Sequence, residues 1–361
     1  MKLRAGIVFE LLGSGVPASS LVNAPARVPD WDAEYEPERT IASLESAFTL
    51  LGCQPVRLGS PHDLLQMAGN PGGLKDRVDL ALSIGEGFGS RNREAWAPVI
   101  FEMQHIPYLG SDPLTLSLSL DKSWTKLMAA SAGVPTGPHR VVSSVSEINN
   151  YPLPAPFPFF VKPRYEGTAK GIGPFSRVEN MEELHAAVDR INSFYDQPAL
   201  VEPFYSGAEY TVTIVGNERT GGLRALPVLQ RAIEVTTGIG LHAIERHDPA
   251  DFGRSGWDYA TPGSLSAELE EELVRLSLVV FKALDCRDFA RMDFRLDDGG
   301  KPFFLEVNTL PTFDPEGSFG IIAELSGISP EELLAGIFYD ALLRLGFSAD
   351  DLTEPESRKE S

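Results

Sequence analysis

Apolar residues follow two different spacings in the first third of the chain, and the two spacings alternate. Short apolar runs at 5–9 and 78–84 are typical of buried strands, whereas the apolar positions of 38–51 recur at helical spacing and predict an amphipathic helix. A second helix is predicted over 93–105, and a short strand that runs into a turn follows at 106–111. Strands that alternate with helices indicate βαβ units.

The pattern from Asp112 to Ala132 is helical, and Asp121 is placed to cap a second helical segment that starts near Lys122. A proline cluster at 151–158 then marks a connector. The strands that follow it predict a mixed sheet. The remaining predicted elements are a strand at 159–162, a glycine-rich loop at 167–173, helices at 179–194, 266–284 and 330–345, and a frayed charged end at 354–361.

Polar and apolar residues alternate with a period of two near the end of the chain. Segments 291–296 and 301–308, joined by a turn at 297–300, therefore predict an antiparallel hairpin. The alternation places a polar set on one face, namely Asp293, Glu306 and Asn308, with Arg291 beside them. It places an apolar set on the other face, namely Met292, Phe294, Phe303, Leu305 and Val307.

The polar face of this hairpin is a candidate metal and phosphate site. Its three oxygen ligands, next to an arginine, suit a Mg²⁺-bound polyphosphate better than zinc, because Mg²⁺ keeps to oxygen donors. A solvated hairpin with ordinary charges is the alternative, since short motifs also occur by chance.

Composition limits the function classes. The chain has 361 residues, of which 43% are hydrophobic, which is enough for two or three domains. Its net charge of −20 disfavours nucleic acid and anionic membrane surfaces as partners, so any phosphate must be held locally. No stretch approaches the length of an apolar membrane helix, and Glu10 interrupts the one run that resembles a signal peptide.

Cysteine and histidine usage points to a reducing compartment without a zinc site. Cys53 and Cys286 cannot form a disulfide framework and fit small buried residues, so we expect a cytoplasmic protein. The histidines show no metal-ligand spacing and are expected to be surface or core residues: His62, His105, His139, His185, His242 and His247.

Two further segments carry candidate nucleotide chemistry. The loop that follows Lys162 contains glycines, the Thr168 hydroxyl and Lys170, and such a loop can fold over phosphates. A flexible loop with solubilising lysines is the alternative. Segment 199–212 predicts two strands joined by a polar connector, with aromatic residues beside them. These elements could form a binding site for a purine base, or they could be an ordinary pair of strands.

The order of these segments resembles the D-alanine-D-alanine ligase family of ATP-grasp enzymes, from about residue 106 to residue 318. The most specific stretch is Ile106-Pro-Tyr-Leu-Gly-Ser-Asp112, continued by Leu120-Asp-Lys-Ser-Trp-Thr-Lys126 and Gly133-Val-Pro-Thr136. The other matching stretches are Phe157 to Pro163 with Glu166-Gly-Thr168, Leu200 to Glu209, Ala290 to Phe294, and Leu305 to Pro311.

The resemblance implies a fold that is part α/β and part α+β: an ATP-grasp fold preceded by a Rossmann-like pre-ATP-grasp domain. The expected divisions are an N-terminal domain at 1–120, a central lid subdomain at 121–205, a catalytic domain at 206–348 and a tail at 349–361. The family often pairs through its N-terminal domain, which implies a homodimer.

The resemblance also implies roles for individual residues. Those expected to bind ATP are Lys122, Lys162, Glu166, Thr168, Ala169, Glu202, Pro203, Phe204, Tyr205, Glu209 and Arg246. Two Mg²⁺ ions, which Mn²⁺ could replace, would be bound by Asp293, Glu306 and Asn308. Arg291 would stabilise the tetrahedral oxyanion, the Thr168 backbone would contact the γ-phosphate, and Ser318 would bind the second substrate's carboxylate.

The implied reaction joins two amino acids, or an amino acid and a related amine. ATP phosphorylates the first carboxylate, and the amine of the second substrate attacks the acyl phosphate, releasing ADP and phosphate. The glycine-rich loop and segment 239–257 are expected to close over the site and exclude water.

Departures from the family pattern lie where the substrates should bind. Segments 83–89 and 92–95 replace the usual His-Gly and Gly-Glu-Asp-Gly patterns, and Arg246-His247 replaces a Lys-Tyr pair. Leu310-Pro-Thr312 lacks the usual glycine. The glutamate that orients the first substrate has four candidates: Glu10, Glu34, Glu36 and Glu38.

These departures favour a specialised ligase and leave other interpretations open. One is an authentic D-alanine-D-alanine ligase of cell-wall synthesis. Another is an ATP-binding protein without catalysis, which the intact set of candidate ligands disfavours. Other ATP-grasp enzymes, such as biotin-dependent carboxylases, are disfavoured by the stretch from Ile106 to Lys126.

Overall fold

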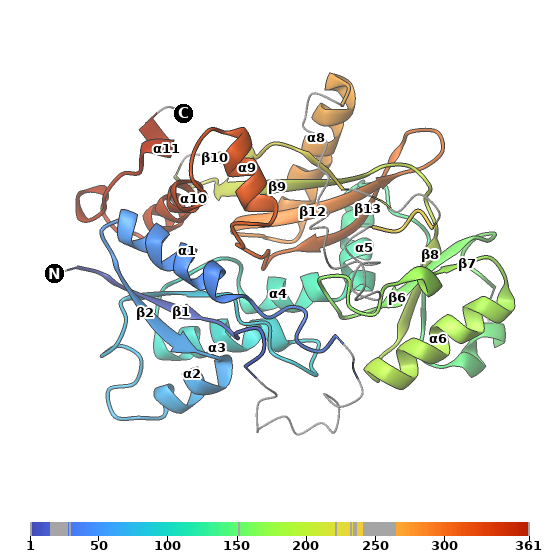
Figure 1. The fold of residues 1–361 in the computed structure, drawn as a ribbon, viewed down its shortest axis with the longest axis horizontal. Helices are drawn as coiled ribbons and strands as arrows, with labels where there is room; N and C mark the ends of the chain where they lie inside the picture. The colour runs from blue at the N-terminus through green and yellow to red at the C-terminus, as the bar shows by residue number, and fades with distance from the viewer. Residues whose placement is uncertain are drawn as a thin grey trace.

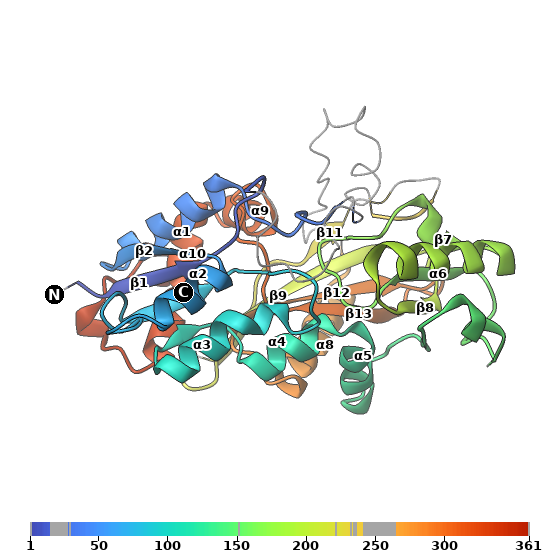
Figure 2. The same cartoon turned by 90° about the horizontal axis from the view of Figure 1, so that it is seen from below.

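The computed structural model describes residues 2–14, 28, 30–150, 152–220, 222–231, 233, 237–240 and 265–359. These residues form three β-sheets that lie in a row along the longest axis of the molecule (Figures 1 and 2). Within the described ranges, no helix combines the length and the apolar character needed to cross a bilayer.

The first sheet is parallel and has the order β2-β1-β3-β4. Its strands are β1 (Arg4–Val8), β2 (Gln54–Gly59), β3 (Leu80–Ser83) and β4 (Tyr108–Leu109), and the helices around it are α1 (Glu38–Leu50), α2 (Pro61–Ala68) and α3 (Trp96–Gln104). The βαβ prediction is therefore correct. Strand β2 and helix α2 were not predicted. A local signal for α2 was present, because Ser60 and Asp63 form a capping box at its start.

The second sheet is antiparallel, in the order β5-β8-β6-β7, and it is reached through two consecutive helices. The helices are α4 (Pro113–Leu120) and α5 (Lys122–Ser131), and the strands are β5 (Arg140–Val142), β6 (Phe159–Pro163), β7 (Arg177–Val178) and β8 (Ala199–Pro203). Helix α6 (Met181–Tyr195) packs on this sheet through Leu184, Val188 and Ile191.

The third sheet lies between the other two, in the order β10-β9-β12-β13, with β11 also paired to β9. Its strands are β9 (Glu209–Asn217), β10 (Gly222–Ala225), β11 (Leu229–Arg231), β12 (Asp288–Leu296) and β13 (Pro302–Asn308). The helices after β11 are α8 (Ala267–Ala283), α9 (Ser318–Leu325), α10 (Pro330–Arg344) and α11 (Glu356–Lys359).

The predicted hairpin forms, but a bulge changes its alternation. Asp293 pairs with Glu306 and Phe294 pairs with Phe304, so Leu305 is an extra residue in β13. Phe304 is therefore fully buried in the core beside Phe294, whereas Phe303 and Leu305 turn to the polar face. The prediction that Phe303 and Leu305 share a face with Met292 was wrong, because one inserted residue reverses the face of those that precede it.

The end of the chain is also more ordered than predicted. Residues 356–359 form α11, the Ser357 hydroxyl donates to the backbone oxygen of Glu332, and Arg358 pairs with Asp340 at 3.0 Å. The frayed end predicted for 354–361 is therefore wrong for its described part, because these contacts hold α11 against α10.

One hydrophobic core joins the first and last parts of the chain. Phe48 of α1 stacks on Phe338 of α10 with ring centroids 5.1 Å apart, and Phe313 packs against Phe338 and Phe289. Figure 1 shows α10 beside α1. The first sheet and the third sheet are thus fixed relative to one another through shared aromatic packing.

Candidate active site

A cavity of about 600 Å³ opens where the three sheets meet. Its walls come from the segment before α1, from the glycine-rich loop, from the end of β8 and from the polar face of β12 and β13. Most of the predicted site residues line it: Lys162, Thr168, Ala169, Glu202, Pro203, Phe204, Tyr205, Glu209, Arg291, Asp293, Glu306 and Asn308. A small adjoining cavity is lined by Lys122 and Glu166.

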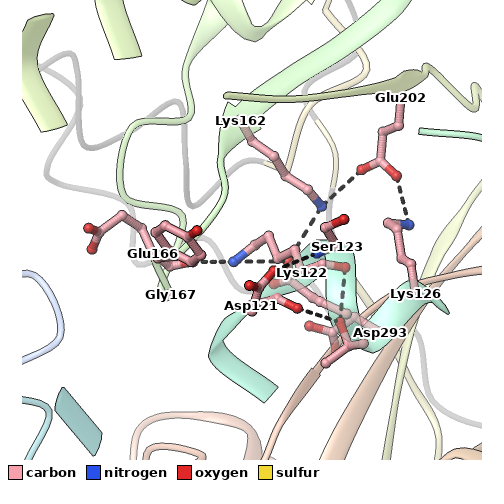
Figure 3. Close-up of polar contacts among 12 residues, drawn as sticks. Asp121, Lys122, Ser123, Lys126, Lys162, Glu166, Gly167, Glu202 and Asp293 are labelled. Carbon is pink, nitrogen blue, oxygen red and sulfur yellow. Dashed lines mark hydrogen bonds and ion pairs between the residues drawn. The ribbon is translucent and has the colours of Figure 1, made fainter. Parts of the chain in front are cut away.

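Lysines and glutamates alternate in a series of ion pairs beside the cavity, and Figure 3 shows the part formed by Lys126, Glu202 and Lys162. Lys126 pairs with Glu202 at 2.7 Å, and Lys162 bridges Glu202 at 3.0 Å and Glu306 at 3.4 Å. Lys122 continues the row at 3.6 Å from Glu306. We call these five residues the lysine-glutamate row.

The row keeps its carboxylates ionised despite their burial. Burial alone would raise the pKa of Glu202, but Lys126 and Lys162 outweigh it and lower that pKa to about 2. Burial likewise opposes ionisation of Glu306, and Lys122, Lys162 and Arg291 lower its pKa well below the usual range. The site is therefore a preformed ionic arrangement at neutral pH.

Asp121 fixes the first lysine of the row. Its carboxylate accepts the backbone N–H groups of Ser123 and Trp124, so it caps α5 as predicted. It also accepts two hydrogen bonds from Arg164, at 2.7 and 2.8 Å, which tie α5 to the strand that carries Lys162. The Lys122 ammonium donates to the backbone oxygen of Glu166 at the start of the glycine-rich loop.

The end of β8 forms an aromatic wall. Tyr205 stacks on Phe303 with ring centroids 4.4 Å apart and planes 13° apart. Phe204 lies between the guanidinium groups of Arg177 and Arg295, at 4.6 and 4.9 Å from the ring centroid. Because of the bulge in β13, Phe303 contributes to this wall, which suits a flat heteroaromatic ring.

Glu209 lies in the cavity at the start of β9. Arg231 and Arg295 approach its carboxylate at 3.7 and 3.5 Å. Burial nevertheless raises the pKa of Glu209 above its ordinary value. Its position beside the aromatic wall agrees with the predicted contact to a ribose hydroxyl, a role that stays a prediction.

The three predicted metal ligands converge on one face of the hairpin. Asp293 lies opposite Glu306 across the two strands, and it accepts hydrogen bonds from Thr211 at 2.6 Å and from Arg291 at 3.1 Å. Asn308 accepts the backbone N–H of Leu310 at 2.9 Å. In the described part of the chain, no three acidic, histidine or cysteine side chains form a metal site, so the Asn308 amide oxygen would have to complete the set.

This donor set fits a hard cation. Two carboxylates and an amide oxygen match Mg²⁺. In the structure, Arg291 pairs with Asp293, and Lys122 and Lys162 pair with Glu306. Cations that surround these carboxylates show that the site is built to hold positive charge.

The glycine-rich loop is held by Glu34, from the segment before α1. Glu34 accepts the Gly167 backbone N–H at 2.7 Å, pairs with Lys170 at 3.0 Å and pairs with Arg93 at 2.8 Å. Burial alone would raise the pKa of Glu34, but Arg93 and Lys170 lower it to about 2. Thr168, next to Gly167, has a left-handed backbone with φ of 47°.

The structure distinguishes the four glutamates that the sequence offers as candidates to orient the first substrate. Glu34 and Glu36 line the cavity. Glu10 is buried behind it and accepts the backbone N–H of Glu86 at 3.0 Å. Glu38 is exposed and pairs with Arg57, so its carboxylate points away from the site.

One predicted site residue of the described ranges, Ser318, lines neither cavity. Ser318 is buried at the first position of α9, and the neighbouring Gly317 lines the wall instead. Arg246 and His247 lie outside the described residues, as does most of the predicted closing segment 239–257.

Sequence reasoning missed Lys126, Arg93 and Glu86. Lys126 is fully buried, and its spacing of four residues from Lys122 on one helix face was the available signal. Arg93 is 2% exposed and pairs with a glutamate 59 positions away, which no local pattern reveals. Glu86 lies in the loop after β3 and lines both cavities.

Comparison with known proteins identifies the family. Residues 129–338 match the family model described as D-ala D-ala ligase C-terminus, which is more than half of the chain. A D-alanine-D-alanine ligase of Bordetella avium is 31% identical over 68% of this chain and 73% of that protein. The chain belongs to the D-alanine-D-alanine ligase family. It is therefore an ATP-grasp, peptide-forming ligase, and the predicted enzyme class is confirmed.

Solved structures support the same fold. The D-alanine-D-alanine ligase of Bacillus anthracis complexed with ATP is 22% identical, with a TM-score of 0.66 over 95% of this chain and 99% of that one. The VanG D-Ala:D-Ser ligase of Enterococcus faecalis is 18% identical, with a TM-score of 0.69 over 94% of this chain and 100% of that one. The predicted ATP-grasp fold is thus confirmed for this family member.

Proposed function

We propose that this ligase joins two amino acids, or an amino acid and a related amine, through an acyl phosphate. The observation that carries the proposal is the lysine-glutamate row, which runs from the aromatic wall to the metal-ligand face of one cavity. A carboxylate is a poor electrophile, so it needs activation by phosphorylation before an amine can attack it. The cavity provides room for the phosphates of ATP along the row and for the substrates beside them.

ATP would bind with its base against the aromatic wall and its phosphates along the row. Lys162 and Lys122 offset phosphate charge, and the backbone of Thr168 and Ala169 in the glycine-rich loop faces the same cavity. Asp293, Glu306 and Asn308 would hold two Mg²⁺ ions, which neutralise charge on the transferring phosphoryl group.

Arg291 is placed for the second step. It lines both the large and the small cavity, next to the metal-ligand face. A guanidinium there stabilises the oxyanion that develops when the amine attacks, as the family resemblance implies. Glu34 and Glu36 flank the space on the opposite wall and are the candidates that orient the first substrate's ammonium group.

The identity of the two substrates follows from family names only. Relatives named D-alanine-D-alanine ligase favour D-alanine in both places, whereas a structural neighbour is named as a D-Ala:D-Ser ligase. The altered segments 83–89 and 92–95 favour another pair. The two buried free cysteines agree with action in the cytoplasm, and we expect a homodimer, which the mass in solution tests.

The proposal is tested with purified protein, ATP, Mg²⁺ and a panel of D- and L-amino acids, singly and in pairs. Phosphate release and mass detection of products are followed together. We expect ATP-dependent formation of one dipeptide or amide. D-alanyl-D-alanine as the main product would identify a cell-wall activity, whereas a different product would identify a specialised ligase. Absence of any condensed product, with ATP still bound, would overturn the proposal.

A further inference from the structure

Amide formation requires the amine substrate to lose a proton, and neither the lysine-glutamate row nor Arg291 is suited to accept it. At neutral pH the amine substrate is an ammonium ion, which has no lone pair and cannot attack an acyl phosphate. A group that accepts its proton must therefore face the reacting carbonyl. This inference rests on the proposed function and concerns its second step.

The two adjoining cavities define where such a group can lie. Six residues line both of them, and these six surround the junction at which the phosphate path meets the substrate space: Glu34, Glu86, Thr168, Arg291, Glu306 and Asn308. A carboxylate is a suitable proton acceptor at this position, and three of the six are glutamates.

Two of these three glutamates are already engaged. Glu34 pairs with Arg93 and Lys170 and accepts the Gly167 N–H. Glu306 pairs with Lys122 and Lys162 and belongs to the metal-ligand face. Glu86 differs, because no lysine or arginine of the described residues lies within 4 Å of its carboxyl group.

We propose that Glu86, together with the neighbouring Glu94, accepts the proton that the amine substrate loses as it attacks the acyl phosphate. Glu94 is buried and lines the small cavity. Glu94 lies close enough to Glu86 for each carboxyl group to shift the pKa of the other, so the two groups titrate as a pair that can take up and release a proton.

The loop that carries Glu86 is held firmly. The backbone N–H of Glu86 donates a hydrogen bond to the Glu10 carboxylate at 3.0 Å. Gly87 has φ of 61°, and a Cβ there would meet the Trp96 ring at 3.0 Å and Arg93 at 3.1 Å, so the loop packs closely on the helix behind it. These contacts fix the backbone of Glu86 at the edge of both cavities.

The charges around Glu86 agree with this role. Burial raises the pKa of Glu86 well above its ordinary value, and Glu94, Glu34 and Glu10 raise it further, whereas Arg93 lowers it. Burial also raises the pKa of Glu94 to about 7, and Arg93 and Lys122 oppose that rise. Carboxyl groups whose pKa is raised in this way are better matched to an amine than an ordinary glutamate is.

The proton balance of the step is closed. The ammonium nitrogen gives one proton to Glu86 and then forms the C–N bond. The carbon–oxygen bond to the phosphoryl group breaks, and phosphate leaves with the electron pair. The nitrogen gives its second proton to the departing phosphate, and the Glu86 proton passes to solvent before the next turnover.

Hydroxylamine separates this role from a structural one, because most of it is uncharged at neutral pH and needs no proton acceptor. The test uses the amino acid pair with the highest turnover in the panel, and then hydroxylamine in place of the second substrate. We expect Glu86→Gln to lower ligation by about 100-fold or more. Hydroxamate formation should change less than about threefold, because activation of the first carboxylate is intact.

Two further variants and a pH profile sharpen the test. Glu86→Asp, which keeps a carboxylate, should recover part of the ligation rate, and Glu182→Gln on the exposed face of α6 should behave as wild type. The ligation rate of the wild type should fall toward acid pH as the pair becomes protonated, and Glu86→Gln should lose this dependence.

The outcomes distinguish the inference from the proposed function. Equal loss of ligation and hydroxamate formation in Glu86→Gln, or no loss of either, would overturn the role of Glu86 alone. Absence of ATP-dependent hydroxamate from the wild type would overturn the proposed function, and the role of Glu86 with it.

Discussion

The two ends of the cavity differ in how their charges are balanced. At the nucleotide end, each carboxylate of the lysine-glutamate row lies within 4 Å of two lysines. At the substrate end, Glu10, Glu36, Glu86 and Glu94 are acids for which the described residues provide no ion pair, and burial raises the pKa of each. Glu34 is the exception at the substrate end, because it pairs with Arg93 and Lys170. Every carboxylate of the row is thus ion-paired, whereas most of the acids around the substrate end are not.

This difference corresponds to what each end must bind. A nucleotide triphosphate is the same in every turnover, so its site can be preorganised by permanent ion pairs. The substrate end must accept cationic amino groups and then take their protons, and unpaired carboxyl groups serve both needs. The comparison predicts that substitutions at the two ends affect different steps.

The largest effect is expected at the metal-ligand face. Glu306→Ala should lower ATP turnover by about 1,000-fold or more, because it removes a predicted Mg²⁺ ligand and leaves Lys122 and Lys162 without their shared partner. The measurement is ADP release with saturating substrates. Glu324→Ala on the exposed side of α9 is the matched control. Turnover within tenfold of wild type would exclude Glu306 as a metal ligand.

A smaller and step-specific effect is expected for Arg291. Arg291→Ala should reduce ligation by about 100-fold while phosphorylation of the first substrate falls much less, because the oxyanion develops only in the second step. Isotope exchange between the bridging and non-bridging oxygens of ATP, with the first substrate alone, reports phosphorylation. Arg291→Lys keeps the charge but not the planar donor pair and should be intermediate. Equal losses in both assays would contradict this division.

Stability should depend on pH in opposite directions at the two ends. The folded pKa of Glu202, about 2, lies below its ordinary 4.5, so its contribution is present above 4.5 and is lost as pH falls toward 2. The folded pKa of Glu10, raised by burial to about 7, lies above 4.5, so the contribution of the protonated form is lost as pH rises through 7.

Substitution of Glu10 makes this difference measurable. The free energy of unfolding of Glu10→Gln minus that of wild type should rise by about 2 kcal/mol from mildly acidic to mildly basic pH. The reason is that Glu10 ionises over this range and glutamine does not. Urea titrations at several pH values provide the measurement. A stability difference that stays constant with pH would show that the folded and unfolded states bind this proton equally.

The smallest expected effects are changes in the free energy of unfolding when either of two tyrosines is replaced. The Tyr35 hydroxyl at the substrate end is buried without a hydrogen-bond partner among the described residues, whereas the Tyr195 hydroxyl donates to Asp30 at 2.7 Å. Tyr195→Phe should cost about 1 kcal/mol, and Tyr35→Phe should change the free energy of unfolding by less than about 0.5 kcal/mol. A larger cost for Tyr35→Phe would reveal a partner for its hydroxyl in the free protein.

Features with a local signature were predictable from the sequence. Asp121 could be assigned as a cap because capping depends on a few adjacent positions, and the hairpin of β12 and β13 could be assigned from its alternation. Strand β2 was missed because its residues are mostly half-buried or exposed and form no apolar run. Its detection depends on the pairing with β1, which is a tertiary contact.

Site features that depend on pairing between distant segments could not be predicted. The bulge at Leu305 adds one residue and leaves no mark in a period-two pattern. The contacts of Glu34 with Arg93 and with Gly167 join segments separated by 59 and 133 positions. Resemblance to a family supplied four members of the lysine-glutamate row, Lys122, Lys162, Glu202 and Glu306, but not Lys126. It could not supply Glu86, because the family pattern differs in that loop.

The stacking of Phe48 on Phe338 has a consequence for synthesis on the ribosome. The first sheet and α1 emerge early, but the aromatic and aliphatic residues that complete their core belong to α10, almost at the end of the chain. A nascent chain therefore carries an apolar surface on α1 until translation is nearly finished. Truncation before α10 should leave a product that chaperones retain, even though every residue of the lysine-glutamate row is present in it.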